Sequence, residues 1–121
     1  SHLFEHFDYK EAFDVLAEWK RVLRPGGTVV IETPDFYASC KRFIQLHDAG
    51  NWGQVNEMYT HFFSEPYVSP GQIHKFLYTP NQLTWTLETA GYTNIRQAPA
   101  LRYIGREDIC MKFLADKPLA C

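Results

Sequence analysis

The chain has 121 residues, of which 45% are hydrophobic and 16% aromatic, and its formal net charge is −2, which predicts one domain with a packed core. The scattered basic residues do not favour nucleic acid or an anionic membrane as a partner, and no apolar run approaches the roughly 20 residues of a membrane span. There is no signal-peptide pattern, and three cysteines without CxxC spacing favour a reducing cytoplasm over a disulfide framework.

The first predicted element is a helix that begins after Asp8, because Asp8 and Glu11 have the spacing of a capping box. Apolar side chains then recur at three- and four-residue steps and form one stripe. The stripe consists of Ala12, Phe13, Leu16, Trp19, Val22 and Leu23. Pro25-Gly26-Gly27 ends the helix, and residues 1–7 are interpreted as the end of a strand or a loop that leads into it.

A short strand is predicted at Thr28–Glu32. Its residues are β-branched and do not alternate with polar ones, which indicates a strand covered on both faces, as in a parallel sheet. Helix, tight loop and buried strand form half of a βαβ unit, which also needs a strand before the helix. No room remains for such a strand ahead of Asp8.

The middle of the chain is predicted to be helical and then irregular. Thr33-Pro34-Asp35 breaks the strand and offers an N-cap, and helical spacing predicts a helix at Phe36–Ala49. A short helix is predicted within Asn51–Tyr59. Residues 60–71 contain two prolines and several rings, which predicts an irregular loop of the kind that carries substrate contacts.

The last third of the chain predicts a helix and two strands. Thr79 and Pro80 form a helix start, and Gly91 followed by Tyr92 a helix end. Leu83, Leu87 and Ala90 make the inner face of this helix. Strands are predicted at Asn94–Ala98 and Ile109–Ala115, and because their link is too short for a crossover helix we expect them to be antiparallel. The predicted fold class is α/β.

Two stretches carry a family resemblance. In the first stretch, residues 1–35, the matching residues are His2-Leu3-Phe4-Glu5-His6, Leu16, Glu18, Arg21-Val22-Leu23, Pro25-Gly26-Gly27 and Pro34-Asp35. The second stretch is residues 74–95, HKFLYTPNQLTWTLETAGYTNI. Together they resemble a class I S-adenosylmethionine-dependent methyltransferase of the type 11 kind. The resemblance implies a Rossmann-like sheet of order 3-2-1-4-5-7-6, with strand 7 antiparallel. The three predicted strands are then strands 5, 6 and 7 in chain order. Residues 1–121 would be the C-terminal part of one domain, with a helical and aromatic insert at about 36–72.

The same resemblance implies a set of site residues. Ser1, His2 and Leu3 fit the position after strand 4 that lies against the cofactor, although they could be a mere chain terminus. Thr33 and Pro34 would rim the acceptor site, whereas Asp35 is more consistent with a helix cap.

Two histidines are candidates for a catalytic base. His74, with Tyr78, occupies the family's position near the acceptor or else a surface loop. His6 faces the pocket or has a structural role. No metal ligand set is predicted.

The sequence departs from the family in one respect that affects function. The glycine-rich turn and the acidic residue that hold S-adenosylmethionine are absent, and Gly26-Gly27 lies at a helix C-terminus, the wrong side for a ligand. We therefore expect this chain alone to be inactive, as part of a longer methyltransferase that acts on a small-molecule or sugar-like acceptor. The sequence before Ser1 would test this. The exposed edge of the Thr28–Glu32 strand could support a homodimer.

Two other functions remain open from the sequence. The chain could be a non-catalytic interaction or regulatory remnant of the fold. His2-Leu3-Phe4-Glu5-His6 also has the HxxEH pattern of some zinc hydrolases, which needs both histidines on one helical face and a third ligand downstream.

Trp19 and Trp85 are expected in the core. Phe62, Phe63 and Tyr67 are expected to pack rather than bind substrate.

Overall fold

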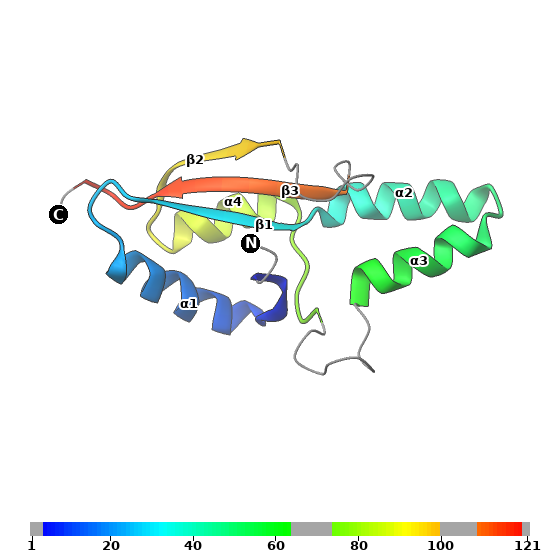
Figure 1. Ribbon diagram of the computed structural model, residues 1–121, viewed down its shortest axis with the longest axis horizontal. Helices are drawn as coiled ribbons and strands as arrows, with labels where there is room; N and C mark the ends of the chain where they lie inside the picture. The colour runs from blue at the N-terminus through cyan, green and yellow to red at the C-terminus, as the bar shows by residue number, and fades with distance from the viewer. Residues whose placement is uncertain (1–3, 64–73, 100–108, 120–121) are drawn as a thin grey trace.

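The computed structural model describes residues 4–63, 74–99 and 109–119. These ranges form a mixed α/β domain whose helices and strands are shown in Figure 1. In chain order they are a 3₁₀ turn (Phe4–His6), α1 (Tyr9–Val22), β1 (Thr28–Pro34), α2 (Phe36–Asp48), α3 (Trp52–Phe63), α4 (Pro80–Thr89), β2 (Thr93–Ala98) and β3 (Cys110–Asp116). None of the described helices has the length and apolar character that crossing a membrane requires.

The three strands form an antiparallel sheet of order β1-β3-β2. β3 pairs with β1 from Thr28 opposite Asp116 to Pro34 opposite Cys110. It also pairs with β2, with an irregularity between Thr93 and Arg96. The α/β class and the antiparallel β2–β3 hairpin are confirmed. Among the described strands, β1 has a neighbour on one side only, and the homodimer expected through its other edge stays a prediction.

The core lies between one face of the sheet and the helices α1 and α4, which lie on the same side of it (Figure 1). Its buried members come from both helices, all the strands except β2, and the segments next to them. They are Phe4, Ala12, Leu16, Val29, Ile31, Tyr78, Leu83, Leu87, Tyr92, Met111, Phe113 and Ala115. Leu83 and Leu87 are the inner-face residues predicted for α4, and this prediction is confirmed.

The other face of the sheet is open in the described part of the chain. Burial alternates along β1 and β3, and Val30 is 44% exposed between the buried residues Val29 and Ile31. The expectation that this strand is covered on both faces is therefore wrong. An antiparallel sheet with helices on one side buries alternate residues, whatever the β-branched content of the strand.

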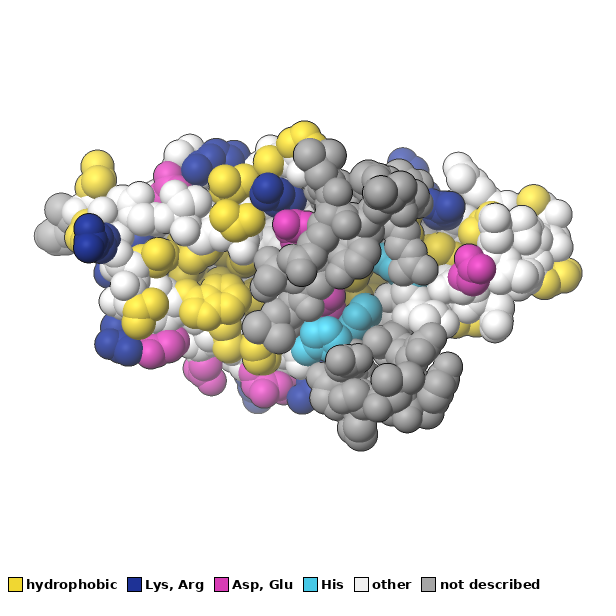
Figure 2. Space-filling model, in the orientation of Figure 1, with side chains coloured by type: hydrophobic (Ala, Val, Ile, Leu, Met, Phe, Trp, Pro, Cys, Tyr) yellow, Lys and Arg dark blue, Asp and Glu magenta, His cyan; other side chains and the backbone are white. Residues whose placement is uncertain are grey.

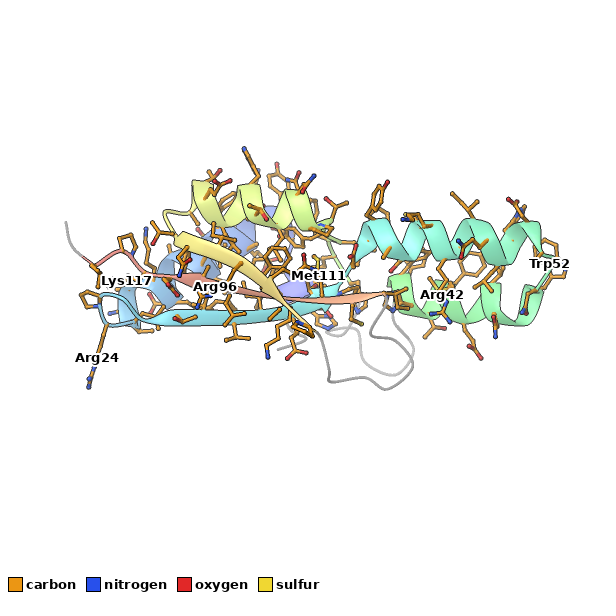
Figure 3. All side chains as sticks on the ribbon, turned by 90° about the horizontal axis from the view of Figure 1, so that it is seen from above. Arg24, Arg42, Trp52, Arg96, Met111 and Lys117 are labelled. Carbon is orange, nitrogen blue, oxygen red and sulfur yellow. The ribbon has the colours of Figure 1, made fainter. Side chains whose placement is uncertain are left out.

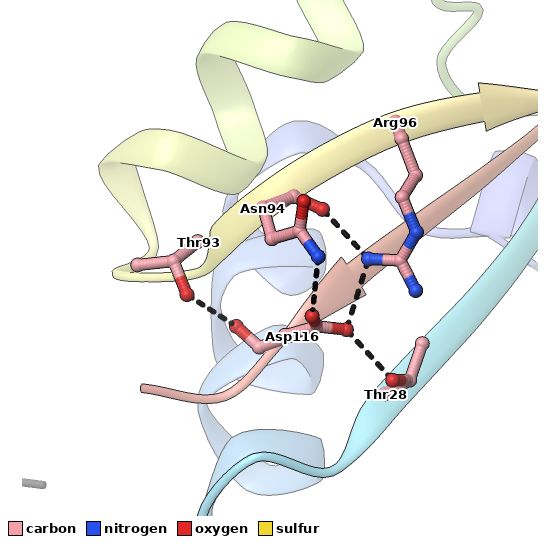
Figure 4. Close-up of polar contacts among 5 residues, drawn as sticks. All are labelled: Thr28, Thr93, Asn94, Arg96 and Asp116. Carbon is pink, nitrogen blue, oxygen red and sulfur yellow. Dashed lines mark hydrogen bonds and ion pairs between the residues drawn. The ribbon is translucent and has the colours of Figure 1, made fainter. Parts of the chain in front are cut away.

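A polar cluster crosses all three strands at one end of the open face (Figure 4). The Asp116 carboxylate accepts hydrogen bonds from the Thr28 hydroxyl at 2.7 Å, the Asn94 amide at 2.8 Å and the Arg96 guanidinium at 3.1 Å. These hydrogen bonds lower the pKa of Asp116 to about 2, and the bond from Thr28 has the largest effect. The cluster therefore joins β1 and β2 through the central strand.

The predicted helix starts are confirmed by their hydrogen bonds. The Asp8 carboxylate accepts from the backbone N–H of Glu11 at 2.8 Å, while the Glu11 side chain accepts from the Asp8 N–H at 3.2 Å, which completes a capping box. Asp35 caps α2 through the Ala38 N–H at 3.0 Å. The α4 helix begins in the same way at Thr79.

The helices α2 and α3 form a hairpin that projects away from the sheet, with Trp52 at its far tip (Figures 1 and 3). The α3 helix continues to Phe63, so the irregular loop expected from Thr60 is wrong for residues 60–63. Val55, Met58 and His61 are its buried residues, and their three-residue spacing is the helical signal that the aromatic composition obscured. The rest of the expected loop, including Tyr67, lies outside the described residues.

Two further expectations need correction. Val22 is 63% exposed and Trp85 55% exposed, whereas Trp19 packs against the core as predicted. Val22 belongs to the predicted apolar stripe of α1. Trp85 lies two residues from both Leu83 and Leu87, which is about 200° around a helix, so its side chain points away from the buried face of α4. Phe4–His6 forms a 3₁₀ turn, which agrees with the loop alternative predicted for this stretch, and Phe4 is buried against Tyr78 and Trp19.

Candidate functional site

Three titratable side chains meet beside the carboxyl-terminal end of β1: Glu5, His6 and His74. The 3₁₀ turn supplies Glu5 and His6, and the buried Glu5 carboxylate accepts a long hydrogen bond of 3.4 Å from the hydroxyl of Thr33 on β1. The Lys75 backbone N–H donates to the Glu5 carbonyl at 2.8 Å, which holds the neighbouring His74 against the turn. Histidine side chains gather near the middle of the face in Figure 2.

The orientation of the His74 ring follows from its hydrogen bonding. Nδ1 lies 3.0 Å from the Phe62 carbonyl oxygen, which can only accept, so Nδ1 carries the proton. Nε2 lies 3.8 Å from the Glu5 carboxylate, and the ring meets His6 edge-on at a centroid distance of 5.0 Å. Burial lowers the pKa of His74, although the charge of Glu5 partly opposes this shift. Burial therefore favours the neutral ring, in which the hydrogen bond from Nδ1 leaves the lone pair on Nε2, the nitrogen that faces Glu5.

The structure brings together only some of the residues predicted from sequence. His6, His74 and Thr33 meet around Glu5, a residue that the sequence singled out within the family resemblance and the HxxEH pattern but not as a site residue. Pro34 is buried at the end of β1. The predicted cofactor contacts at positions 1–3 lie outside the described residues.

Tyr78 belongs to the core rather than to an open site. It is 1% exposed, and its ring packs against those of Phe4 and Phe76 at 5.2 and 4.9 Å. Its hydroxyl has no hydrogen-bond partner among the described residues, and burial raises its pKa to about 12. Tyr78 lines a cavity of about 270 Å³ between α1 and α4, together with Tyr9, Phe13, Phe76, Gln82, Trp85 and Thr86.

An apolar pocket of about 430 Å³ lies along the α2–α3 hairpin. Its lining consists of Phe36, Cys40, Phe43, Ile44, Phe62, Phe63 and Leu77. Phe62 links this pocket to the histidine cluster, because its carbonyl holds the His74 ring. Burial raises the pKa of the Cys40 thiol, so Cys40 is not an activated nucleophile.

A buried serine–histidine pair between α2 and α3 has a structural role. The Ser39 hydroxyl lies 2.7 Å from the Asp35 carbonyl oxygen and 3.0 Å from His61 Nε2. A hydroxyl has one proton, and we assign it to the shorter bond, so that His61 donates to Ser39. A nucleophilic serine needs the opposite direction, with its proton given to the histidine.

The geometry does not match the zinc hydrolase suggested by HxxEH. Glu5 and His6 lie on a 3₁₀ turn of three residues, not on a helix that could present both histidines of the motif on one face. His2 lies outside the described residues.

Comparison with known proteins shows a shared fold. No family model and no curated protein sequence matches the chain. A crystal structure of the CurJ carbon methyltransferase is similar, with a TM-score of 0.55 and 13% identity over 98% of this chain and 28% of that one. A possible exported protein from Bordetella parapertussis is similar with a TM-score of 0.57 and 20% identity, over 98% of this chain and 37% of that one.

These likenesses concern the backbone arrangement alone. This chain spans about a third of the length of the two solved structures, so the activity of a whole neighbouring protein is not transferred by the match. The likeness shows a fold shared with one carbon methyltransferase, and a shared fold does not by itself imply a shared function.

Proposed function

We propose that this chain is part of a methyltransferase domain that transfers a methyl group from S-adenosylmethionine to a small-molecule acceptor. The fold likeness to a carbon methyltransferase along 98% of the chain supports this. So does the order β1-β3-β2, which equals the order 5-7-6 that the sequence resemblance implies for a Rossmann-like methyltransferase sheet.

The observation that carries the proposal is the meeting of His6 and His74 at the carboxyl-terminal end of β1, beside Thr33. Open α/β sheets bind their ligands at the carboxyl ends of the strands. Two residues distant in sequence, each selected from the sequence as a candidate base, lie at that end of the strand.

The chemistry requires little from the protein beyond position and a base. Methyl transfer is an in-line displacement, and holding the acceptor in line can supply most of the rate. His74 takes up the proton that the acceptor gives up, through the Nε2 lone pair that its bond to Phe62 leaves available. The Glu5 carboxylate, 3.8 Å away, stabilises the imidazolium that results.

The acceptor we propose has an apolar body. The pocket along α2 and α3 is lined by rings and aliphatic side chains and adjoins His74 through Phe62. Such a lining suits an apolar small molecule better than a sugar-like one, whose hydroxyls would lose hydrogen bonds to water on binding.

The described residues do not form a binding site that fits S-adenosylmethionine. The only consecutive glycines form the turn before β1, and a Cβ at Gly26 would lie 2.9 Å from the Leu119 side chain. That turn packs against the Leu119 side chain and lies at the opposite end of β1 from His74. When bound, the cofactor supplies the methyl group, and in this proposal residues of a longer chain bind it.

The test has two parts. Calorimetry with S-adenosylhomocysteine on the 121-residue chain is expected to detect no micromolar binding. A longer chain that includes a glycine-rich turn is expected to bind it and to label an apolar acceptor with radioactive methyl. His74→Ala should then lower kcat by roughly 10²–10⁴-fold, the usual contribution of a general base.

His47→Ala is the matched control, because His47 is exposed on α2 and pairs with Asp48. It should leave kcat unchanged. A longer chain that fails to bind S-adenosylhomocysteine would contradict methyl transfer. Full activity in the His74→Ala variant would contradict the assigned base but not the reaction.

A further inference from the structure

The same three side chains have the composition of a metal site. One ligand atom from each of Glu5, His6 and His74 can be chosen so that all lie within 4.8 Å of one another. Zinc binds imidazole nitrogen and carboxylate oxygen at about 2.0–2.2 Å, so ligands of one tetrahedral ion lie roughly 3.3–3.6 Å apart. Small side-chain rotations would bring the three atoms to that spacing. We propose that Glu5, His6 and His74 bind a divalent transition-metal ion, with zinc as the preferred ion.

The His74 ring is already oriented as a metal ligand. Its Nδ1 donates to the Phe62 carbonyl, and this is the kind of bond that fixes the tautomer of metal-binding histidines. Nε2 therefore presents a lone pair to the Glu5 carboxylate oxygen at 3.8 Å. Two electron-rich atoms that face each other are stabilised by a cation between them, either a proton or a metal ion.

The surrounding backbone holds the ligands in place before any ion binds. The Glu5 carbonyl accepts from the N–H groups of Lys75 and Phe76 at 2.8 and 3.4 Å, which ties the segment of His74 to the turn of Glu5 and His6. The Thr33 hydroxyl donates to the other carboxylate oxygen of Glu5. Such supporting hydrogen bonds orient ligands and raise metal affinity.

The ligand set determines the choice of ion. Two imidazoles and one carboxylate favour zinc and related transition metals, whereas magnesium prefers oxygen ligands and keeps several waters. Three protein ligands also leave a fourth zinc position open, as in catalytic rather than structural sites. This set differs from HxxEH, because its second histidine is His74 and not His2.

Metal binding does not depend on the methyl-transfer proposal. A bound ion occupies Nε2 of His74, the atom assigned above to proton uptake, so the metal-free and metal-loaded sites have different chemistry. The binding experiment contains neither cofactor nor acceptor, and its failure would leave the methyl-transfer assays unaffected.

The experiment is a titration of the chelator-treated chain with zinc sulfate by calorimetry, with magnesium chloride as the comparison. We expect one zinc per chain with micromolar or tighter affinity, and much weaker binding of magnesium. His74→Ala and Glu5→Gln should each weaken zinc binding at least tenfold, while His47→Ala on the exposed side of α2 should not.

A loss of zinc binding must be distinguished from a loss of folding. Circular dichroism of each variant without zinc establishes that it is folded, and Glu5→Gln keeps the shape of the side chain if His74→Ala is unstable. Zinc binding that survives both substitutions would overturn the proposal. So would binding that needs His6 but not His74, or a loss that is equal in the His47→Ala control.

Discussion

The phenolic hydroxyl of Tyr92 donates a 2.7 Å hydrogen bond to the backbone carbonyl of Leu16 inside the core, across 76 positions of sequence. The bond ties the start of β2 to the middle of α1. Burial raises the pKa of Tyr92 to about 12, the same value as for Tyr78, so both phenols stay neutral in the folded protein.

The two tyrosines make a matched pair of substitutions. Tyr92→Phe removes a satisfied hydrogen bond and should lower the free energy of unfolding by about 1 kcal/mol. Tyr78→Phe removes a hydroxyl that has no partner among the described residues, and should leave stability unchanged or raise it. Urea unfolding of both variants measures the difference. Equal losses would show that the Tyr78 hydroxyl is bonded after all.

Two glycines of the α2–α3 hairpin should respond in opposite directions to alanine. Gly50 closes α2 at φ +72°, whereas Gly53 lies within α3 without a positive φ, and a Cβ at either would meet no atom within 4 Å. Gly50→Ala should lower the free energy of unfolding by roughly 1–2 kcal/mol, because alanine is strained in the left-handed backbone conformation at this position. Gly53→Ala should raise the free energy of unfolding by up to about 1 kcal/mol, because alanine has a higher helix propensity than glycine. Thermal unfolding tests the signs, and two changes of the same sign would contradict the assigned backbone.

The Asp116 cluster should make stability depend on pH in the acid range. The folded-state pKa of about 2 lies below the ordinary 3.8, so the unfolded chain binds a proton first. The stabilisation from ionised Asp116 is complete above pH 3.8 and is lost as the pH falls toward 2. Asp116→Asn should therefore be less stable than the natural chain near neutral pH. The gap should close on acidification, and a gap that is constant with pH would contradict the prediction.

The start of α4 offers a test of capping. The Thr79 hydroxyl accepts from the Gln82 N–H at 3.1 Å, and Thr79→Ala should lower the free energy of unfolding by about 1 kcal/mol. Thr79→Ser keeps the hydroxyl and should retain most of the stability. Thr89→Ala, at the exposed end of the same helix, is the control and should change it by less than about 0.5 kcal/mol. A Thr79→Ala variant as stable as the control would mean that the cap contributes little.

The sequence by itself determined where α1, α2 and α4 begin and where α4 ends. Asp8, Asp35 and Thr79 act on N–H groups within three residues, and Gly91 ends α4 through bonds from its own N–H and that of Tyr92 to the last turn. Such interactions span a few residues and can be read from spacing alone. The antiparallel hairpin was likewise predictable, because a short link allows no crossover.

Only the tertiary structure decided which faces are covered and which side chains meet. Val30 fits the pattern of a strand covered on both faces and Val22 fits an apolar helical stripe, but both are exposed, because burial depends on whether another element lies opposite. Glu5 and His74 are 69 positions apart, and nothing in their local sequences specifies the 3.8 Å between the carboxylate and Nε2. The physical reason is range: capping and turn preferences act along the chain, whereas burial and the candidate site arise from contacts across it.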